Sequence, residues 1–166
     1  MRINSYYKFF SIFLILLSIS SFFVGFIYGE NSAGAGGFNG DFINTWKNLQ
    51  LFLNNDISTA VLITTSADQE IFVSSRTPLI YILHKLFNPF VKNEIIFIRS
   101  VFFISLLLPF LFYLCLREKF KEKENLLLIL ISSIILLSPY FRTSSFWAGE
   151  ENFGLISLLI SFIFLN

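Results

Sequence analysis

The feature that most constrains this chain is a stretch without any charged residue, 9–28, that is apolar along almost its whole length. A helix needs about 20 mainly apolar residues to cross the hydrocarbon core of a membrane, and this stretch supplies them. The composition agrees, because 55% of the 166 residues are hydrophobic and 14% are charged, whereas a typical soluble domain carries about 25% charged residues. We therefore predict an all-α, polytopic membrane protein.

Three further apolar stretches follow along the chain. The first of them carries Arg99 near its start, and the second contains Pro139, which a membrane helix tolerates. The last is too short to cross a membrane before the sequence ends. We predict three full spans and an incomplete fourth within one transmembrane domain: residues 9–28, 95–116, 126–141 and 153–166.

The distribution of lysine and arginine in short segments gives the orientation. The segment REKFKEKEN (117–125) has a basic excess, and Arg2 and Lys8 precede the first span. Cytoplasmic segments carry such an excess, so we expect a cytoplasmic N-terminus in a bacterial inner (plasma) membrane. Residues 29–94 then form a long outer loop. Because the fourth stretch is unfinished, we expect residues 1–166 to be the N-terminal fragment of a larger protein.

A cleaved signal peptide is the alternative reading of residues 9–28. Ala33-Gly34-Ala35 resembles a small-residue cleavage site. The apolar core is longer than the 7–15 residues that are typical of a signal peptide. We therefore favour a retained helix.

The outer loop contains two segments with helical periodicity. Apolar residues recur in the first at spacings of three and four: Phe42, Trp46, Leu49 and Leu53. Pro78 opens the second, which ends at Asn88-Pro89. The first helix, so close to a membrane span, is predicted to lie flat in the interface. The second is predicted either to lie in the interface or to pack at shallow depth between spans.

Acidic residues flank the apolar stretches on the outer side. Asp41 follows the first span, and Glu150 and Glu151 follow the third. Acids that face one another at the membrane surface suggest an active site there. The alternative for Asp41 is that it caps the helix that follows, since Asp is favoured at the N-cap.

Two arginines also lie near the outer surface. Arg76 can bind a phosphate through two hydrogen bonds or contact lipid headgroups. Arg99 lies about one turn inside the second span, where an arginine is either functional or extends its charge to the interface.

Other classes of site have little support. His84 and Cys115 are the single histidine and cysteine, so the sequence has no Cys/His cluster with metal-binding spacing and no internal disulfide. The net charge is +1, and no basic run is interleaved with aromatics, so we predict no nucleic-acid partner. No cofactor follows from the sequence, although the acids could hold a divalent metal.

Together these residues resemble the N-terminal portion of the GT-C superfamily of membrane glycosyltransferases, and in particular its protein O-mannosyltransferase and aminoarabinose-transferase branch. Asp41 matches the acid that follows the first helix in that family, although Phe42 stands where a second acid is often found. RTPLIYIL (76–83) resembles the family's proline-containing stretch. Arg99 matches an arginine at the start of the next span.

The segment SPYFRTSSFWAGEENFGLISLL (138–159) resembles the family's proline and small polar residues before an acid that opens a helix. Glu150 or Glu151 would be that acid. The resemblance covers nearly the whole chain, mostly as topology.

The resemblance implies transfer of a sugar from a polyprenyl-phosphate-linked donor to an acceptor at the outer face. Asp41 would be the general base, and Glu150 or Glu151 would orient the acceptor or a metal ion. The donor phosphate would be bound by arginines near the interface: Arg76, Arg99 and Arg142. Three alternatives stay open: a non-catalytic transporter or assembly subunit, a polysaccharide polymerase or ligase, and a small signal-anchored protein.

Overall fold

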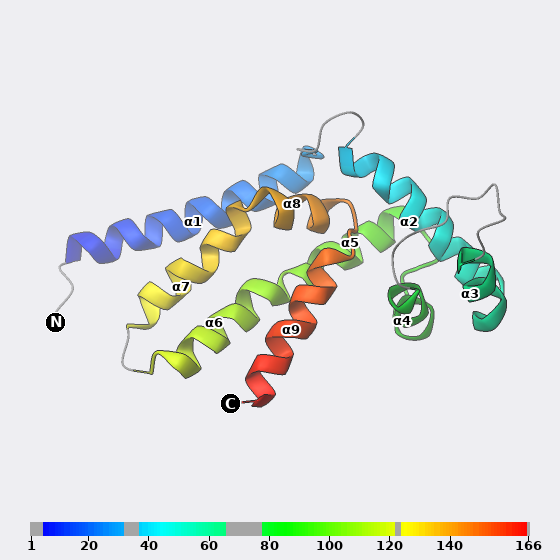
Figure 1. Ribbon diagram of the computed structural model, residues 1–166. Helices are drawn as coiled ribbons and strands as arrows, with labels where there is room; N and C mark the ends of the chain where they lie inside the picture. Colours follow the sequence, from blue (N-terminus) through cyan, green and yellow to red (C-terminus); the bar gives the residue numbers. More distant parts are fainter. Residues whose placement is uncertain (1–4, 32–36, 66–77, 122–123, 166) are drawn as a thin grey trace.

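The computed structural model describes residues 5–31, 37–65, 78–121 and 124–165, and every regular element in these ranges is helical (Figure 1). The predicted all-α class is confirmed. The elements in chain order are α1 (Ser5–Ile27), α2 (Gly37–Asn54), α3 (Ile57–Thr65), α4 (Leu79–Phe87), α5 (Glu94–Ser105), α6 (Leu107–Lys119), α7 (Asn125–Ser133), the 3-10 helix η1 (Ile134–Leu137), α8 (Pro139–Phe146) and α9 (Glu151–Leu165).

The long apolar helices form a bundle, and α2, α3 and α4 gather beyond one of its ends (Figure 1). Helix α1 packs along α7 and η1, and α6 packs between α7 and α9. The end of α6 and the start of α7 lie at the opposite end of the bundle, as does the start of α1 (Figure 1). The described basic residues of this segment, Arg117, Lys119 and Lys121, are thus at the same end of the bundle as the start of α1, as the predicted orientation requires.

Two helices are long and apolar enough to cross a membrane, Ser5–Ile27 and Glu94–Lys119. They match the first and second predicted spans. The second is made of α5 and α6, which meet at Leu106. Pro109 lies just beyond, and its ring cannot donate a backbone hydrogen bond and crowds the carbonyl of Ser105 one turn earlier. This explains why the span is interrupted there.

The third predicted span, residues 126–141, is not one straight helix. The chain runs as a helix over Asn125–Leu137 and then bends by 65° into Pro139–Phe146. Ser138 takes the N-cap position of α8, where its Oγ accepts a hydrogen bond from the Phe141 N–H at 3.5 Å, and Pro139 is the first helical residue. A proline at this position starts a new helix because it has no N–H to continue the old one. Three full spans are therefore not confirmed, and α9, with 15 residues, is a shorter apolar helix.

The α2 face that the spacing predicts is buried against other protein elements. Phe42 and Leu49 are 2% and 0% exposed and belong to one apolar cluster with residues of α4 and α5. Lys85 of α4 donates from Nζ to the carbonyl oxygens of Phe52, at 2.7 Å, and Asn55. A cation at these positions satisfies carbonyls that the C-terminus of α2 leaves without partners. Helices α2 and α4 are thus packed on each other, which the prediction of separate interfacial helices did not include.

Helix α3 begins at an aspartate cap. Asp56 Oδ2 accepts hydrogen bonds from the Thr59 N–H at 2.9 Å and from the Ser58 hydroxyl. These bonds, first from Ser58 and then from Thr59, hold the pKa of Asp56 well below its usual value. Asp56 is exposed, so its role is local: it fixes where α3 starts.

His84 lies on the buried face of α4. Its ring is 6% exposed and lies edge-on to Phe97 and Phe153, with centroids 5.0 and 5.1 Å away. The Asn88 amide is 3.2 Å from His84 Nδ1. Burial lowers the pKa of His84 to about 4 from 6.5, so the side chain is neutral at neutral pH.

Acidification from about pH 7 to about pH 5 is expected to destabilise the fold by about 2 kcal/mol through His84. The unfolded chain binds a proton at this histidine below pH 6.5, and the folded chain does so only near pH 4. The stabilisation of the fold by neutral His84 is therefore complete above the pKa of His84 in the unfolded chain. It is lost as the pH falls towards the pKa of His84 in the folded chain. Thermal unfolding in an uncharged detergent at the two pH values measures it. In the His84→Gln variant the pH dependence should be smaller, and an unchanged dependence would assign it to other groups.

Phenylalanine rings join α1, α5 and α8 at the centre of the bundle. The Phe22 ring stacks on those of Phe102 and Phe141, with centroids 5.2 and 5.4 Å away, and lies 5.0 Å from that of Phe146. Such pairs each contribute about 0.5–1.5 kcal/mol beyond their burial. They hold the bent helix α8 against the C-terminal part of α1.

Candidate functional site

The junction of α8 and α9 brings a carboxylate to the end of the bundle beside α2 (Figure 1). Helix α8 ends in a turn in which the Gly149 N–H donates to the Ser144 carbonyl at 2.7 Å, and Ala148 has a φ of +50°. The Ser144 hydroxyl donates to Glu151 Oε2 at 3.1 Å. Glu151 is also in the first turn of α9, where the helix dipole favours a negative charge.

Gly149 leaves room for the Glu151 carboxylate to turn back towards Ser144. A Cβ at Gly149 would lie 2.5 Å from Glu151 Oε2 and 2.9 Å from the Ser144 Cα. Real Cβ atoms do not approach other heavy atoms so closely, and the Ser144 Cα is backbone that cannot swing aside. The short segment between α8 and α9 therefore needs a glycine here, and it fixes the direction of the Glu151 side chain.

An apolar pocket of about 620 Å³ extends from Glu151 along α9. Helices α6, α8 and α9, with η1, supply most of its wall, and Phe38 of α2 closes one side. Glu151 and Asn152 lie on the first turn of α9, and the apolar residues of α9 lie further along it, so the polar part of the wall is at the N-terminal end of α9. The lining residues are Phe38, Leu108, Phe112, Ile135, Ser138, Tyr140, Phe141, Glu151, Asn152, Leu155, Leu158 and Leu159.

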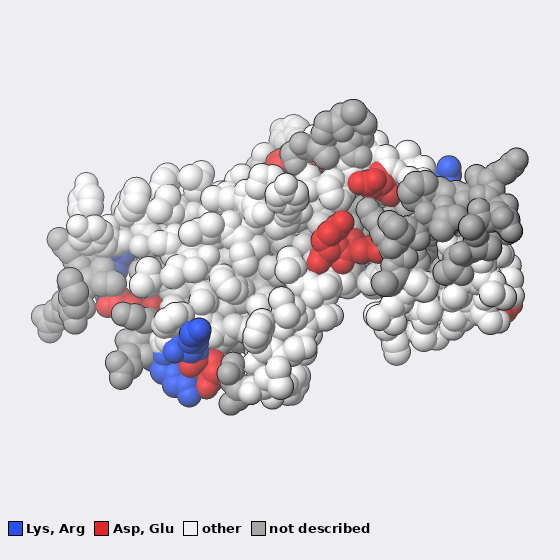
Figure 2. Space-filling view, viewed as in Figure 1, with Lys and Arg blue, Asp and Glu red and all other residues white. Residues whose placement is uncertain are grey.

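Asp41 lies one turn further along α2 than Phe38, and its side chain is exposed. Because residues three apart share a helix face, Asp41 is near the side of α2 that meets the pocket. Figure 2 shows acidic side chains over the start of α2 and over the α8–α9 junction. The structure thus brings the start of α2 and the α8–α9 junction to the same end of the bundle, and Glu150, which is half-buried, lies between α8 and Glu151.

The capping alternative for Asp41 does not fit the structure. Helix α2 begins at Gly37, so Asp41 is its fifth residue and lies beyond the first turn. An N-cap residue stands before the first helical residue. Asp41 is therefore not explained by capping.

Arg142 is held by an ion pair with Glu30, a residue that the sequence did not single out. Arg142 Nε donates to Glu30 Oε1 at 2.9 Å, and Nη2 donates to Glu30 Oε2. Nη1 donates to the Ser21 hydroxyl at 3.1 Å and to the Leu136 carbonyl at 3.2 Å, and Nη2 donates to the Ser21 carbonyl at 3.0 Å. These bonds use all the N–H groups of a guanidinium. We therefore assign Arg142 to packing between α1 and α8 rather than to a donor phosphate.

Glu30 is positioned by the end of α1. Gly29 has a φ of +62°, and the N–H groups of Gly29 and Glu30 donate to the Phe26 and Gly25 carbonyls at 3.1 and 2.9 Å. This is the Schellman arrangement, which favours glycine at the left-handed position. The Trp147 Nε1–H donates to the Glu30 carbonyl at 2.9 Å, so Trp147 joins the same contact.

The other two predicted arginines do not meet the pocket in the described part of the chain. Arg99 is exposed on α5 and shares a face with Ile95 and Phe103, which are 60% and 62% exposed. The buried face of α5 is elsewhere, at Phe97, Val101, Phe102 and Ser105. Arg76 lies outside the described residues.

Asn152 forms a buried polar cluster beneath Glu151. Its side chain is 1% exposed, and Nδ2 donates to the Ser145 hydroxyl at 2.8 Å, the Ser105 hydroxyl at 3.2 Å and the Phe141 carbonyl at 3.3 Å. These bonds tie α9 to α8 and α5 in an apolar setting, where polar side chains commonly join helices. In the sequence, the serines within the apolar stretches are the feature that could have indicated this polar cluster.

Among the described residues, no three His, Cys, Asp or Glu side chains gather as a metal site would require. The divalent metal that the acids could hold therefore has no such cluster in this part of the chain. Comparison with protein-family models, with curated proteins and with solved structures finds no match.

Proposed function

We propose that this chain is part of a membrane glycosyltransferase that takes its sugar from a polyprenyl-phosphate-linked donor. The observation that carries the proposal is the apolar pocket with Glu151 at its outer end and the start of α2, which bears Asp41, beside it. A polyprenyl chain needs apolar walls, and the sugar that it carries needs polar groups at the membrane boundary. The pocket combines the two.

The proposed reaction needs one proton acceptor. Asp41 takes the proton of an acceptor hydroxyl or amine while that atom bonds to the anomeric carbon of the sugar. The bond from the anomeric carbon to the phosphate oxygen breaks, and the polyprenyl phosphate leaves with the electron pair. Glu151, whose direction Ser144 and Gly149 fix, orients the acceptor. Arg76 remains the proposed phosphate ligand, whereas Arg99 is not among the residues that line the pocket.

Filling the pocket should weaken binding of a polyprenyl phosphate. Leu155→Trp places a large ring among the apolar lining residues, and each CH₂ group that it excludes costs about 0.8 kcal/mol. We expect affinity to fall by about 10-fold or more. Native mass spectrometry of the intact protein in an uncharged detergent, titrated with a long-chain polyprenyl phosphate, measures this.

Ile160→Trp is the matched control for this experiment. Leu155 and Ile160 are on the same helix and are 46% and 40% exposed, but Ile160 does not line the pocket. Binding should be unchanged in that variant. Equal binding by wild type and Leu155→Trp would remove the pocket as the donor site, and with it the observation on which the proposal rests.

A transporter is the second candidate, and the 65° break between α7–η1 and α8 favours it. Interrupted helices often line transport sites near the middle of a membrane. Uptake into sealed vesicles by the purified protein, without consumption of a lipid-linked sugar, would support this candidate over the first.

A further inference from the structure

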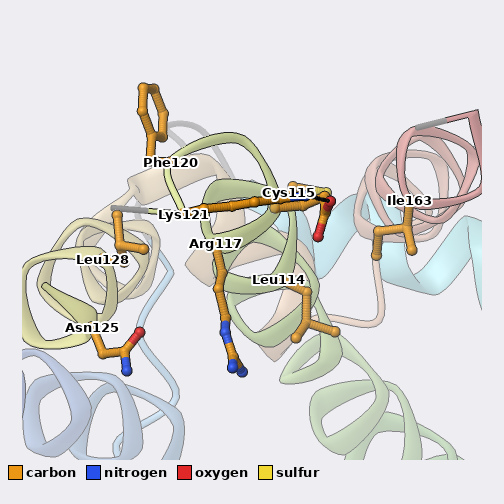
Figure 3. A pocket seen from close by; sticks show the side chains of 9 residues that line it. Leu114, Cys115, Arg117, Phe120, Lys121, Asn125, Leu128 and Ile163 are labelled. Atoms are coloured by element: carbon orange, nitrogen blue, oxygen red, sulfur yellow. Dashed lines mark ion pairs between the residues drawn. The ribbon is translucent and has the colours of Figure 1, made fainter. Parts of the chain in front are cut away.

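A second pocket, of about 690 Å³, lies at the end of the bundle opposite Glu151, where α6 ends and α7 begins (Figure 3). Its apolar wall includes Leu114 of α6, Leu128 of α7 and Ile163 of α9. Arg117, Glu118 and Lys121 add charges at the end of α6. Neither the acids nor the arginines of the proposed transferase site belong to this pocket.

Among the described residues that line the pocket, Arg117 is the cation left for a ligand. Lys121 Nζ is 2.6 Å from Glu118 Oε1, so these two side chains neutralise each other. Figure 3 shows Arg117 extending away from Lys121, in the same direction as Asn125. No carboxylate of the described residues forms an ion pair with Arg117.

The position of the pocket indicates which kind of anion would bind there. It lies at the end of Glu94–Lys119, a helix long and apolar enough to span a membrane, and therefore at a membrane boundary. Arginine binds a phosphate group through two parallel hydrogen bonds. A soluble phosphate compound would not use the leucine and isoleucine wall, whereas a phospholipid would place an acyl chain there.

We infer that this pocket binds an anionic phospholipid, with the phosphate at Arg117 and an acyl chain along Leu114, Leu128 and Ile163. Basic pockets between membrane helices bind such headgroups. The site is separate from the proposed transferase site and does not depend on it.

Three variants test the inference in the intact protein. In native mass spectrometry with phosphatidylglycerol, Arg117→Gln should weaken binding about 5-fold, since one cation near the surface accounts for about that factor. Glu118→Gln should strengthen it by about the same factor, because it frees Lys121 and removes a negative charge. Lys119→Gln, on the same helix but outside the pocket, should leave binding unchanged.

Each alternative predicts a different result. If charge at the membrane surface were all that mattered, Lys119→Gln would weaken binding as much as Arg117→Gln, and the site would be overturned. Equal binding of phosphatidylcholine and phosphatidylglycerol by wild type would also overturn it. If soluble glycerol phosphate bound as tightly as phosphatidylglycerol, the ligand would be a soluble phosphate compound and the lipid assignment would fail.

Discussion

Asp41→Asn should lower the rate of sugar transfer by about 10²- to 10⁴-fold, the usual contribution of a general base. Asn has the same shape but cannot accept the proton of the acceptor. Asp41 is exposed and is the fifth residue of α2, so neither burial nor capping makes it important for folding. Insertion and stability should therefore be unaffected. The measurement is transfer from a polyprenyl-phosphate-linked sugar in membranes that contain the intact protein.

Asp56→Asn is the matched control for the Asp41 variant. Asp56 is also an exposed aspartate between the first two apolar spans, and its role is to cap α3 through the Thr59 N–H. Asparagine caps helices about as well as aspartate, so transfer should stay at the wild-type rate. Undiminished transfer by Asp41→Asn would remove Asp41 as the base.

Glu30→Ala is expected to destabilise the protein by about 3 kcal/mol, within the range for a buried ion pair that loses one partner. The Arg142 side chain is 9% exposed and would keep its charge without the carboxylate, whereas Glu30 itself is 35% exposed. Removal of the acid should therefore cost more than removal of the arginine. The free energy of unfolding in mixed detergent measures this, with the double variant Glu30→Ala/Arg142→Ala to isolate the pairwise energy.

Glu124→Ala is the control for the loss of an acidic residue as such. Glu124 is exposed and precedes α7, but its side chain makes no capping hydrogen bond. Its replacement should change the stability by less than about 0.5 kcal/mol. A comparable loss in both variants would mean that the ion pair contributes little to the fold.

The sequence predicted the helices whose signal is local. Charge-free length identified α1, and Glu94–Lys119 follows from a second apolar stretch. The spacing of Phe42 and Leu49 predicted the buried face of α2, because a helix repeats every 3.6 residues. Which element would cover that face did not follow, since periodicity describes one helix and not its neighbour.

The pairing of Glu30 with Arg142 could not be predicted in the same way. The two residues are 112 positions apart, and Arg142 was a candidate for a phosphate because its surroundings were unknown. Pro139 was judged tolerable within a span, which is true of many membrane helices. Here Ser138 precedes it and supplies a cap, and the two together end one helix and start another.

The sequence predicted which acids form the candidate site but not how they are arranged in space. The association of Asp41 with Glu151 rested on order along the chain, and the structure adds a shared pocket wall between α2 and α9. Gly149 and Ser144 fix the direction of the Glu151 side chain, but no sequence pattern indicated this. Their importance depends on distances across a turn, which a sequence does not give.

The bend at Ser138 has a consequence for the mechanics of the bundle. A helix end leaves carbonyl oxygens without intrahelical partners, and Arg142, only a few residues beyond the bend, returns to donate to one of them at Leu136. The same guanidinium also donates hydrogen bonds to the Ser21 carbonyl, near the C-terminal end of α1, and to the Glu30 carboxylate just beyond it. Through these bonds one side chain joins the helical segments on either side of the bend to the C-terminal end of α1, so displacement of α1 relative to the third apolar stretch would break them.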